Sequence, residues 1–158
     1  MILVTGASRG LGRAVADRLV DSGYDVFGIS RSAEELPFES AACDVSDYEG
    51  VKAIAQKLRK EKRALQGVIN AAGIASMNLA LTTPPSMTQK LIQTNLVGTI
   101  HCCQLFAPLM IRRKAGSIIN FSTIAVALGL KGESIYAASK AGVEGFSRAF
   151  AREMADFN

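Results

Sequence analysis

The sequence feature that most constrains the fold is a glycine-rich turn between a short apolar run and a helical stretch at the start of the chain. Residues 2–5 read ILVT, which is typical of a buried strand, and residues 5–12 read TGASRGLG. Apolar side chains then recur at helical spacing over 11–21, and Gly23 follows as a residue suited to end a helix. A strand, a glycine turn and a helix in this order indicate an α/β protein.

Short apolar runs and longer helical stretches alternate along the rest of the chain. Strands are expected at 25–30, 40–45, 67–70 and 116–122, and helices at 47–63, 86–113 and 135–156. Asp47 is suited to cap the second helix, and Pro108 predicts a kink or local break in the third. The pattern predicts a three-layer, Rossmann-like, doubly wound parallel sheet with helices on both faces. No repeat or linker divides residues 1–158, so one domain is expected.

Composition excludes several classes of protein. The chain is 49% apolar and 20% charged, no apolar run approaches the ~20 residues of a membrane span, and the N-terminus lacks the basic start of a signal peptide. Its three cysteines show no metal-site spacing, and Cys102 and Cys103 are expected to be small buried thiols. The net charge is +4, and the basic run at 57–63 lacks the interleaved aromatic residues of a nucleic-acid surface. We therefore expect a cytoplasmic protein without a metal, a membrane or a nucleic-acid partner.

The glycine turn has the chemistry of a dinucleotide-binding site. Gly6 can make the tight turn, Gly10 can let the backbone approach a pyrophosphate, and Gly12 can let the helix pack closely on the strand. The helix N-terminus adds unpaired N–H groups and a positive potential. The spacing is G-x-x-x-G-x-G rather than G-x-G-x-x-G, so the prediction depends on its position between strand and helix. The other expected cofactor contacts in this turn are Thr5, Ser8, Arg9 and Leu11.

The end of the second predicted strand bears on the choice between NAD and NADP. Enzymes that select NAD usually have an acidic residue there, which bonds the ribose diol. Here the strand ends in GISRS, so Arg31 can bind a 2′-phosphate bidentately and Arg9 can add a second cation. The other interpretation of Arg31 is a solvated loop cation. The sequence favours NADP, with NAD the less favoured cofactor.

The stretch YAASK at 136–140 places a phenol and an ammonium four residues apart. On a helix, Tyr136 and Lys140 then lie on one face, one turn apart. A nearby cation favours the phenolate form of a phenol, so the pair can release and recover a proton. This is the chemistry needed when a hydride is added to a carbonyl carbon and a proton must reach the oxygen.

Taken together, these motifs resemble the short-chain dehydrogenase/reductase family, and among its members the 3-oxoacyl-[acyl-carrier-protein] reductase-like enzymes. The resemblance rests on TGASRGLG, CDV at 43–45, NAAG at 70–73, Asn95, IINFST at 118–123 and YAASK, in this order. It implies an enzyme that transfers a hydride between NADP and a small-molecule carbonyl or secondary alcohol, with a 3-oxoacyl thioester as one candidate substrate.

The resemblance also implies a role for each catalytic residue. Tyr136 would act as general acid in reduction, and Lys140 would tune it and bond the nicotinamide ribose. Asn95 would bend its helix and hold a water that links Lys140 to solvent. The family's serine usually lies thirteen residues before the tyrosine, which is Thr123 here, with Ser122 as the alternative.

At the adenine end, the resemblance implies two further contacts. Asp44 would accept a hydrogen bond from the adenine amine, and Val45 would lie along the ring. Residues that would cap the fourth strand beneath the cofactor are Asn70, Ala71, Ala72 and Gly73.

Family members continue past the tyrosine helix with another strand, a Pro-Gly loop, a mobile lid and a final strand. None of these follows REMADFN, so the fold is expected to be truncated after the helix that carries Tyr136 and Lys140, with the fifth strand left as an edge. Two other functions stay open: a non-catalytic NADP-binding regulator and a structural fragment that binds nothing. The family also implies a homodimer or homotetramer in the complete protein, formed through the helices at 86–113 and 135–156.

Overall fold

The computed structural model describes residues 1–32 and 35–157. The elements in chain order are β1 (Ile2–Thr5), α1 (Gly10–Asp21), β2 (Val26–Ser30), β3 (Glu39–Ala42), α2 (Tyr48–Lys60), β4 (Gly67–Asn70), the 3₁₀ turn η1 (Ala80–Thr82), α3 (Pro85–Ile92), the π-helical turn η2 (Gln93–Val97), α4 (Gly98–Ile111), β5 (Ser117–Asn120), α5 (Ala125–Leu128), α6 (Ser134–Met154) and the 3₁₀ turn η3 (Ala155–Phe157).

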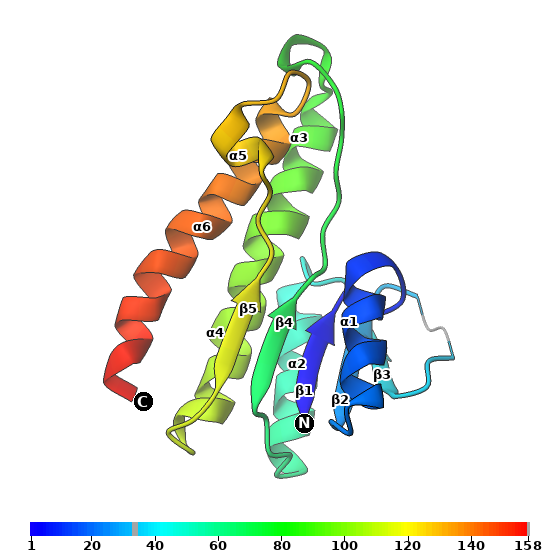
Figure 1. Ribbon diagram of the computed structural model, residues 1–158, viewed down its shortest axis with the longest axis vertical. Helices are drawn as coiled ribbons and strands as arrows, with labels where there is room; N and C mark the ends of the chain where they lie inside the picture. The colour runs from blue at the N-terminus through cyan, green and yellow to red at the C-terminus, as the bar shows by residue number, and fades with distance from the viewer. Residues whose placement is uncertain (33–34, 158) are drawn as a thin grey trace.

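The strands form one parallel sheet in the order β3-β2-β1-β4-β5 (Figure 1). The register aligns Ile2 of β1 with Val26 of β2 and Gly67 of β4, so the carboxyl ends of these three strands lie level. In open α/β sheets, ligands bind outside these ends, where the strand order reverses. The predicted Rossmann-like parallel sheet is confirmed, and β1 lies at its centre.

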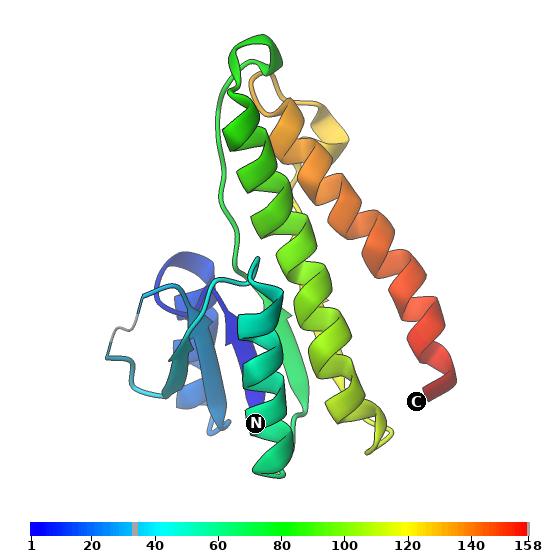
Figure 2. The same cartoon turned by 180° about the vertical axis from the view of Figure 1, so that it is seen from behind.

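Helices cover both faces of the sheet, which confirms the three-layer prediction. α1 lies on one face, and α2, α4 and α6 lie on the other (Figures 1 and 2). Because successive side chains of a strand point to opposite faces, Leu3 packs toward α2 and α4 and Val4 toward α1. The core on the α2 and α4 side is the larger. Cys102 and Cys103 are buried in the protein, and burial raises the pKa of Cys103 to about 11.

The long third helix has its irregularity in a different place from the predicted one. α4 runs through Pro108 without a break, whereas η2 interrupts regular α-helical bonding between α3 and α4. Packing of Phe106 and Ala107 in the core helps to offset the hydrogen bond that the proline removes. The helical run Pro85–Ile111 is the one candidate membrane span among the described residues, by length and composition alone. With 44% of its most apolar window buried in the protein, this is weak support for a span.

Two strands end earlier than predicted because polar groups draw the chain out of the sheet. β3 ends before Asp44, whose Oδ1 accepts hydrogen bonds from the amide and hydroxyl of Ser46 at 2.9 and 2.7 Å. β5 ends before Phe121, whose carbonyl accepts a bond from Lys140 on α6. Both turns bring side chains to the carboxyl edge of the sheet. The short helix α5 in the following loop was not predicted.

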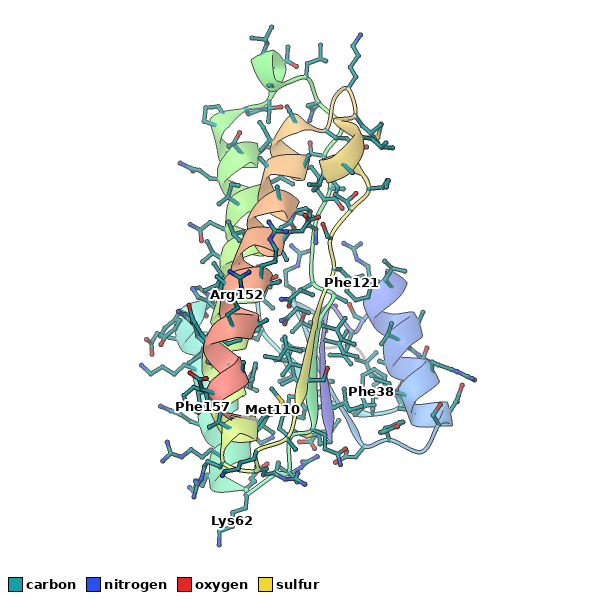
Figure 3. All side chains as sticks on the ribbon, turned by 60° about the vertical axis from the view of Figure 1, so that its left-hand side comes forward. Phe38, Lys62, Met110, Phe121, Arg152 and Phe157 are labelled. Carbon is teal, nitrogen blue, oxygen red and sulfur yellow. The ribbon has the colours of Figure 1, made fainter. Side chains whose placement is uncertain are left out.

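The C-terminal end of α6 lies beside the free edge of β5. A groove of about 280 Å³ separates its last turns from β5 and from the end of α4. Met110 and Phe157, labelled in Figure 3, line this groove together with Ile118 and Phe150. β5 is therefore an edge strand of the described sheet, as expected from the sequence.

Candidate nucleotide cleft and active site

A cleft of about 780 Å³ opens at the carboxyl ends of the strands and joins the glycine turn to the start of α6. Predicted site residues in its wall are Gly6, Ser8, Arg9, Gly10, Leu11, Gly12, Arg31, Asp44, Val45, Ala71, Ala72, Gly73, Ser122, Tyr136 and Lys140. Four others, Thr5, Asn70, Asn95 and Thr123, do not line it. Segments far apart in the sequence thus form one site.

The glycine turn is shaped by close backbone contacts. Gly6 has a φ of +69°, and a Cβ on it would lie 2.9 Å from the backbone of Ala72. A Cβ on Gly12 would lie only 2.3 Å from the carbonyl oxygen of Gly6, so α1 packs directly on the turn. The first residues of α1 line the cleft, and the unpaired N–H groups of a helix N-terminus are suited to bind an anion such as a pyrophosphate.

Thr5 and Asn70 act behind this wall. Thr5 Oγ1 accepts a hydrogen bond of 3.1 Å from the amide of Ala72, which ties the end of β1 to the segment after β4. Asn70 Nδ2 donates to Asn120 Oδ1 at 2.8 Å and so links the ends of β4 and β5. Asn70 Oδ1 is buried without a partner in the described part of the chain. Both side chains hold the floor of the cleft.

The end of the cleft at which the resemblance leads us to expect adenine carries opposite charges. Burial raises the pKa of Asp44, but the hydrogen bonds from Ser46 and the nearby cations Arg31 and Lys90 together lower it by more. The net shift of this pKa is therefore downward. Arg31 is exposed and lines the cleft. An anionic carboxylate that accepts hydrogen bonds thus lies near a guanidinium. The carboxylate is suited to accept from an adenine amine, and the guanidinium is suited to bind a phosphate.

Asn95 is fully buried, at 0% exposure, in the π-helical turn. Its Oδ1 accepts a bond from the amide of Ile74 at 2.8 Å, and its Nδ2 donates to the carbonyl of Ile74 at 2.9 Å and to Ser139 Oγ at 3.0 Å. The π turn lies where the resemblance led us to expect a bend. Through these three hydrogen bonds, the Asn95 side chain joins the loop after β4 to α6.

Lys140 reaches the cleft from the first turns of α6. Its side chain is largely buried, at 6% exposure, and Nζ donates to the carbonyl of Phe121 at 2.9 Å. Burial lowers the pKa of Lys140. A Cβ on Gly73 would lie 3.3 Å from Asn95 Oδ1 and 3.6 Å from this Nζ, so Gly73 lies next to both side chains. Tyr136 lines the same cleft, which brings the phenol and the ammonium to one site.

The two candidate hydroxyl groups have different partners. Ser122 lies in the cleft wall and donates to Glu144 Oε1 at 2.5 Å. Thr123 Oγ1 accepts a bond of 3.3 Å from the amide of Ala125, so its proton is not used in that contact. The geometry keeps both residues as candidates for holding a substrate oxygen.

Sequence reasoning missed several residues that shape the site. Ser139 is fully buried and donates to the carbonyl of Tyr136 at 2.7 Å, and Glu144 binds Ser122. Ser139 could have been found from its place inside YAASK, three residues after Tyr136 on the same face. The described chain, residues 1–32 and 35–157, has no group of three His, Cys, Asp or Glu side chains that could hold a metal ion.

The fold defines an α/β protein of Rossmann type with a cleft at the carboxyl edge of its sheet, and comparison with known proteins identifies the family. The family model described as short chain dehydrogenase matches residues 1–158. The chain belongs to this family.

Individual relatives agree with the assignment. The chain is 37% identical over 166 residues to the 3-oxoacyl-[acyl-carrier-protein] reductase FabG of Staphylococcus aureus, covering 97% of this chain and 68% of the relative. The aldohexose dehydrogenase of Thermoplasma acidophilum superposes with a TM-score of 0.93 at 32% identity, covering 99% of this chain and 62% of that one. A 4-hydroxyisoleucine dehydrogenase, solved with NADH and succinate, has a TM-score of 0.93 at 26% identity. The chain thus spans about two thirds of the first two proteins.

Proposed function

We propose that this protein is an NADP-dependent oxidoreductase that transfers a hydride between the nicotinamide and a carbonyl or secondary alcohol. The observation that carries the proposal is the single cleft that contains both the glycine turn and the Tyr136/Lys140 pair. A 3-oxoacyl thioester is the candidate substrate, because the 37%-identical relative is a 3-oxoacyl-[acyl-carrier-protein] reductase. When bound, the cofactor supplies the hydride.

In this proposal, the chain's own residues handle the proton and the substrate oxygen. As the carbonyl carbon is reduced, Tyr136 donates its phenolic proton to the oxygen, and it takes a proton back in the reverse direction. Lys140, whose Nζ is held by the carbonyl of Phe121, stabilises the phenolate and binds the nicotinamide ribose. Thr123 donates to the substrate oxygen, because Ser122 already donates to Glu144. Ser122, which lines the cleft whereas Thr123 does not, is the alternative donor.

The preference for NADP is assigned to cations at the adenine end. Arg31 binds the 2′-phosphate, Arg9 adds a second contact, and Asp44 accepts from the adenine amine with Val45 along the ring. NAD stays the less favoured alternative, which a structural relative solved with NADH supports. The wider proposal is a cytoplasmic protein in which residues 1–158 form one domain and which assembles as a homodimer or homotetramer.

The test is a calorimetric titration of the 158-residue chain with NADPH and with NADH. We expect one saturable site that prefers NADPH by at least about tenfold, or about 1.4 kcal/mol. Equal affinities would remove the NADP assignment but retain the nucleotide site. If neither cofactor binds, the proposed function is wrong for this chain.

A second candidate is a non-catalytic protein that binds NADP and regulates a partner. The observation that favours it is the free edge of β5 in the described sheet, which a partner could cover. The Tyr136→Phe variant separates the two functions. If the variant loses carbonyl-dependent NADPH oxidation but keeps its NADPH affinity, the enzyme is supported. If the wild-type protein binds NADPH but does not oxidise it with any carbonyl compound tested, the regulator is supported.

A further inference from the structure

The adenine end of the cleft is supported from behind by a side chain that the mechanism does not use. His101 lies on α4, and its Nδ1 is 3.1 Å from the carbonyl oxygen of Val45, the residue assigned to the adenine ring. A carbonyl oxygen can only accept a hydrogen bond, so Nδ1 carries the proton and donates it. The bond spans 56 residues of sequence and joins a rigid helix to a loop.

α4 fixes the same loop a second time, three residues earlier. A Cβ on Gly98 would lie 2.6 Å from Val45 Cγ2 and 3.2 Å from its carbonyl carbon, so the helix surface at this glycine is in direct contact with Val45. Residues three apart lie on one face of a helix, so Gly98 and His101 act on Val45 together. Val45 is buried and yet lines the cleft, which makes it a wall supported on its far side.

The imidazole is itself held in place. The ring of Tyr48, at the start of α2, meets it edge to face, with centroids 5.1 Å apart and planes at 75°. Such contacts orient an aromatic ring. The donor atom of His101 is therefore fixed by α4 and α2 before any ligand arrives.

We propose that His101 is a positioning residue for the adenosine half of the cofactor, which it serves by holding Val45 and the adjoining Asp44 in the conformation that binds it. This inference rests on the proposed function. Preorganising a loop removes the free-energy cost of ordering it on binding, so the effect appears in affinity for adenosine and not in affinity for nicotinamide. His101 does not touch the reacting atoms.

The test compares three variants by calorimetric titration with NADPH, adenosine 2′,5′-bisphosphate and reduced nicotinamide mononucleotide. His101→Phe keeps the ring and removes the donor. His101→Asn places an amide nitrogen on the atom bonded to Cγ, where Nδ1 stands, and so restores the donor. His101→Gln moves the donor one carbon further and serves as a second loss variant if the phenylalanine variant fails to fold.

We expect the Phe and Gln variants to bind NADPH and adenosine 2′,5′-bisphosphate about three- to tenfold more weakly, the usual effect of one lost hydrogen bond. The Asn variant should recover most of this affinity, and reduced nicotinamide mononucleotide should bind all variants equally. Unchanged affinity for the bisphosphate, or an equal loss for both halves of the cofactor, would overturn the inference. If the wild-type chain binds none of the three compounds, the proposed function fails first.

Discussion

The two halves of α6 differ in how they are held. The first half buries Ser139, Lys140 and Val143, and polar contacts tie it to the π turn and to the segment after β5. A side-chain hydrogen bond joins the second half to β5, from Asn120 Nδ2 to Ser147 Oγ at 2.8 Å. Its remaining turns face the groove beside β5. Residues 145–154, which form this second half, include no buried side chain.

This difference teaches where the site draws its rigidity. The contacts that orient the candidate catalytic groups all lie within the first half of α6 and its neighbours, so they do not depend on what covers the groove. We therefore expect changes in the first half to alter both stability and nucleotide binding, and changes in the second half to alter stability or association alone.

The largest effect is expected from Asn95→Ala. The substitution leaves the part-buried amide of Ile74 without its acceptor and removes a donor to the buried hydroxyl of Ser139, and losing the partner of a buried polar group costs about 1–3 kcal/mol. We expect the free energy of unfolding in urea to fall by about 2–4 kcal/mol. Ser147→Ala, in the second half, is the control and should cost about 1 kcal/mol. Equal losses at the two sites would contradict the comparison.

Lys140→Met should change the free energy of unfolding by less than Asn95→Ala does, and should raise it at neutral pH instead of lowering it. Burial lowers the pKa of Lys140 from its ordinary 10.5, so the folded chain binds this proton less tightly than the unfolded chain. Raising the pH toward 10.5 therefore stabilises the wild type but leaves the methionine variant unaffected. We expect the variant to be more stable by about 1 kcal/mol near pH 7, with the difference shrinking as the pH rises.

The pH series needs an exposed lysine as its reference. Lys131→Met removes a solvated ammonium and should show no such trend between pH 7 and pH 10. The urea midpoint of each variant is measured across this range. A stability difference for Lys140→Met that stays constant with pH is the outcome that contradicts the assignment.

Phe150→Ala tests the second half of α6. Phe150 lines the groove and stacks on Phe146 with centroids 5.1 Å apart, but it is only half-buried. We expect a loss of about 1 kcal/mol in the free energy of unfolding and no change in NADPH affinity, because no contact of the cleft passes through it. A tenfold loss of NADPH affinity would show that the two halves are coupled.

The smallest effect on stability is expected from Ile119→Thr on the free edge of β5. Ile119 is 51% exposed, so the change should cost no more than about 0.5 kcal/mol. Its neighbour Ile118 packs against the core on the other face, and Ile118→Thr should cost more. Because exposed apolar edges favour association, sedimentation velocity should show less self-association for Ile119→Thr than for wild type.

Much of the fold was predictable because local pattern and global order agree in this chain. The strands at 2–5 and 67–70 were predicted at their observed bounds, since a short run with β-branched or apolar residues at its centre lies between turn-forming segments in both. The end of β3 was predicted three residues too late, because the apolar pattern continues to Val45 while Asp44 bonds to Ser46 and turns the chain. Side-chain bonds to the backbone compete with the sheet and leave no trace in periodicity.

The site was predictable where a motif fixes the backbone and less so where packing does. Gly6 and Gly12 could be assigned from sequence because the glycine turn lies between a strand and a helix, and the structure shows that their neighbours leave no room for a Cβ. Glu144, Lys90 and His101 come near the site only through the packing of helices far along the chain, which no short motif encodes. Of the kink or local break expected at Pro108, the break was wrong, since α4 continues through it and burial of its neighbours helps to offset the missing hydrogen bond.

The π-helical turn at 93–97 has a consequence for insertions and deletions. A regular α-helix advances about 100° per residue, so removing a residue elsewhere in the run 85–111 would rotate everything after it out of phase with the core. A π turn holds one residue more than an α turn, so a deletion inside 93–97 is absorbed and leaves α3 and α4 in phase. One residue of this turn could therefore be deleted without disturbing the packing of α3 and α4. The same extra residue shapes the turn in which Asn95 binds Ile74. Losing it would leave a more regular helix and an unsupported cleft.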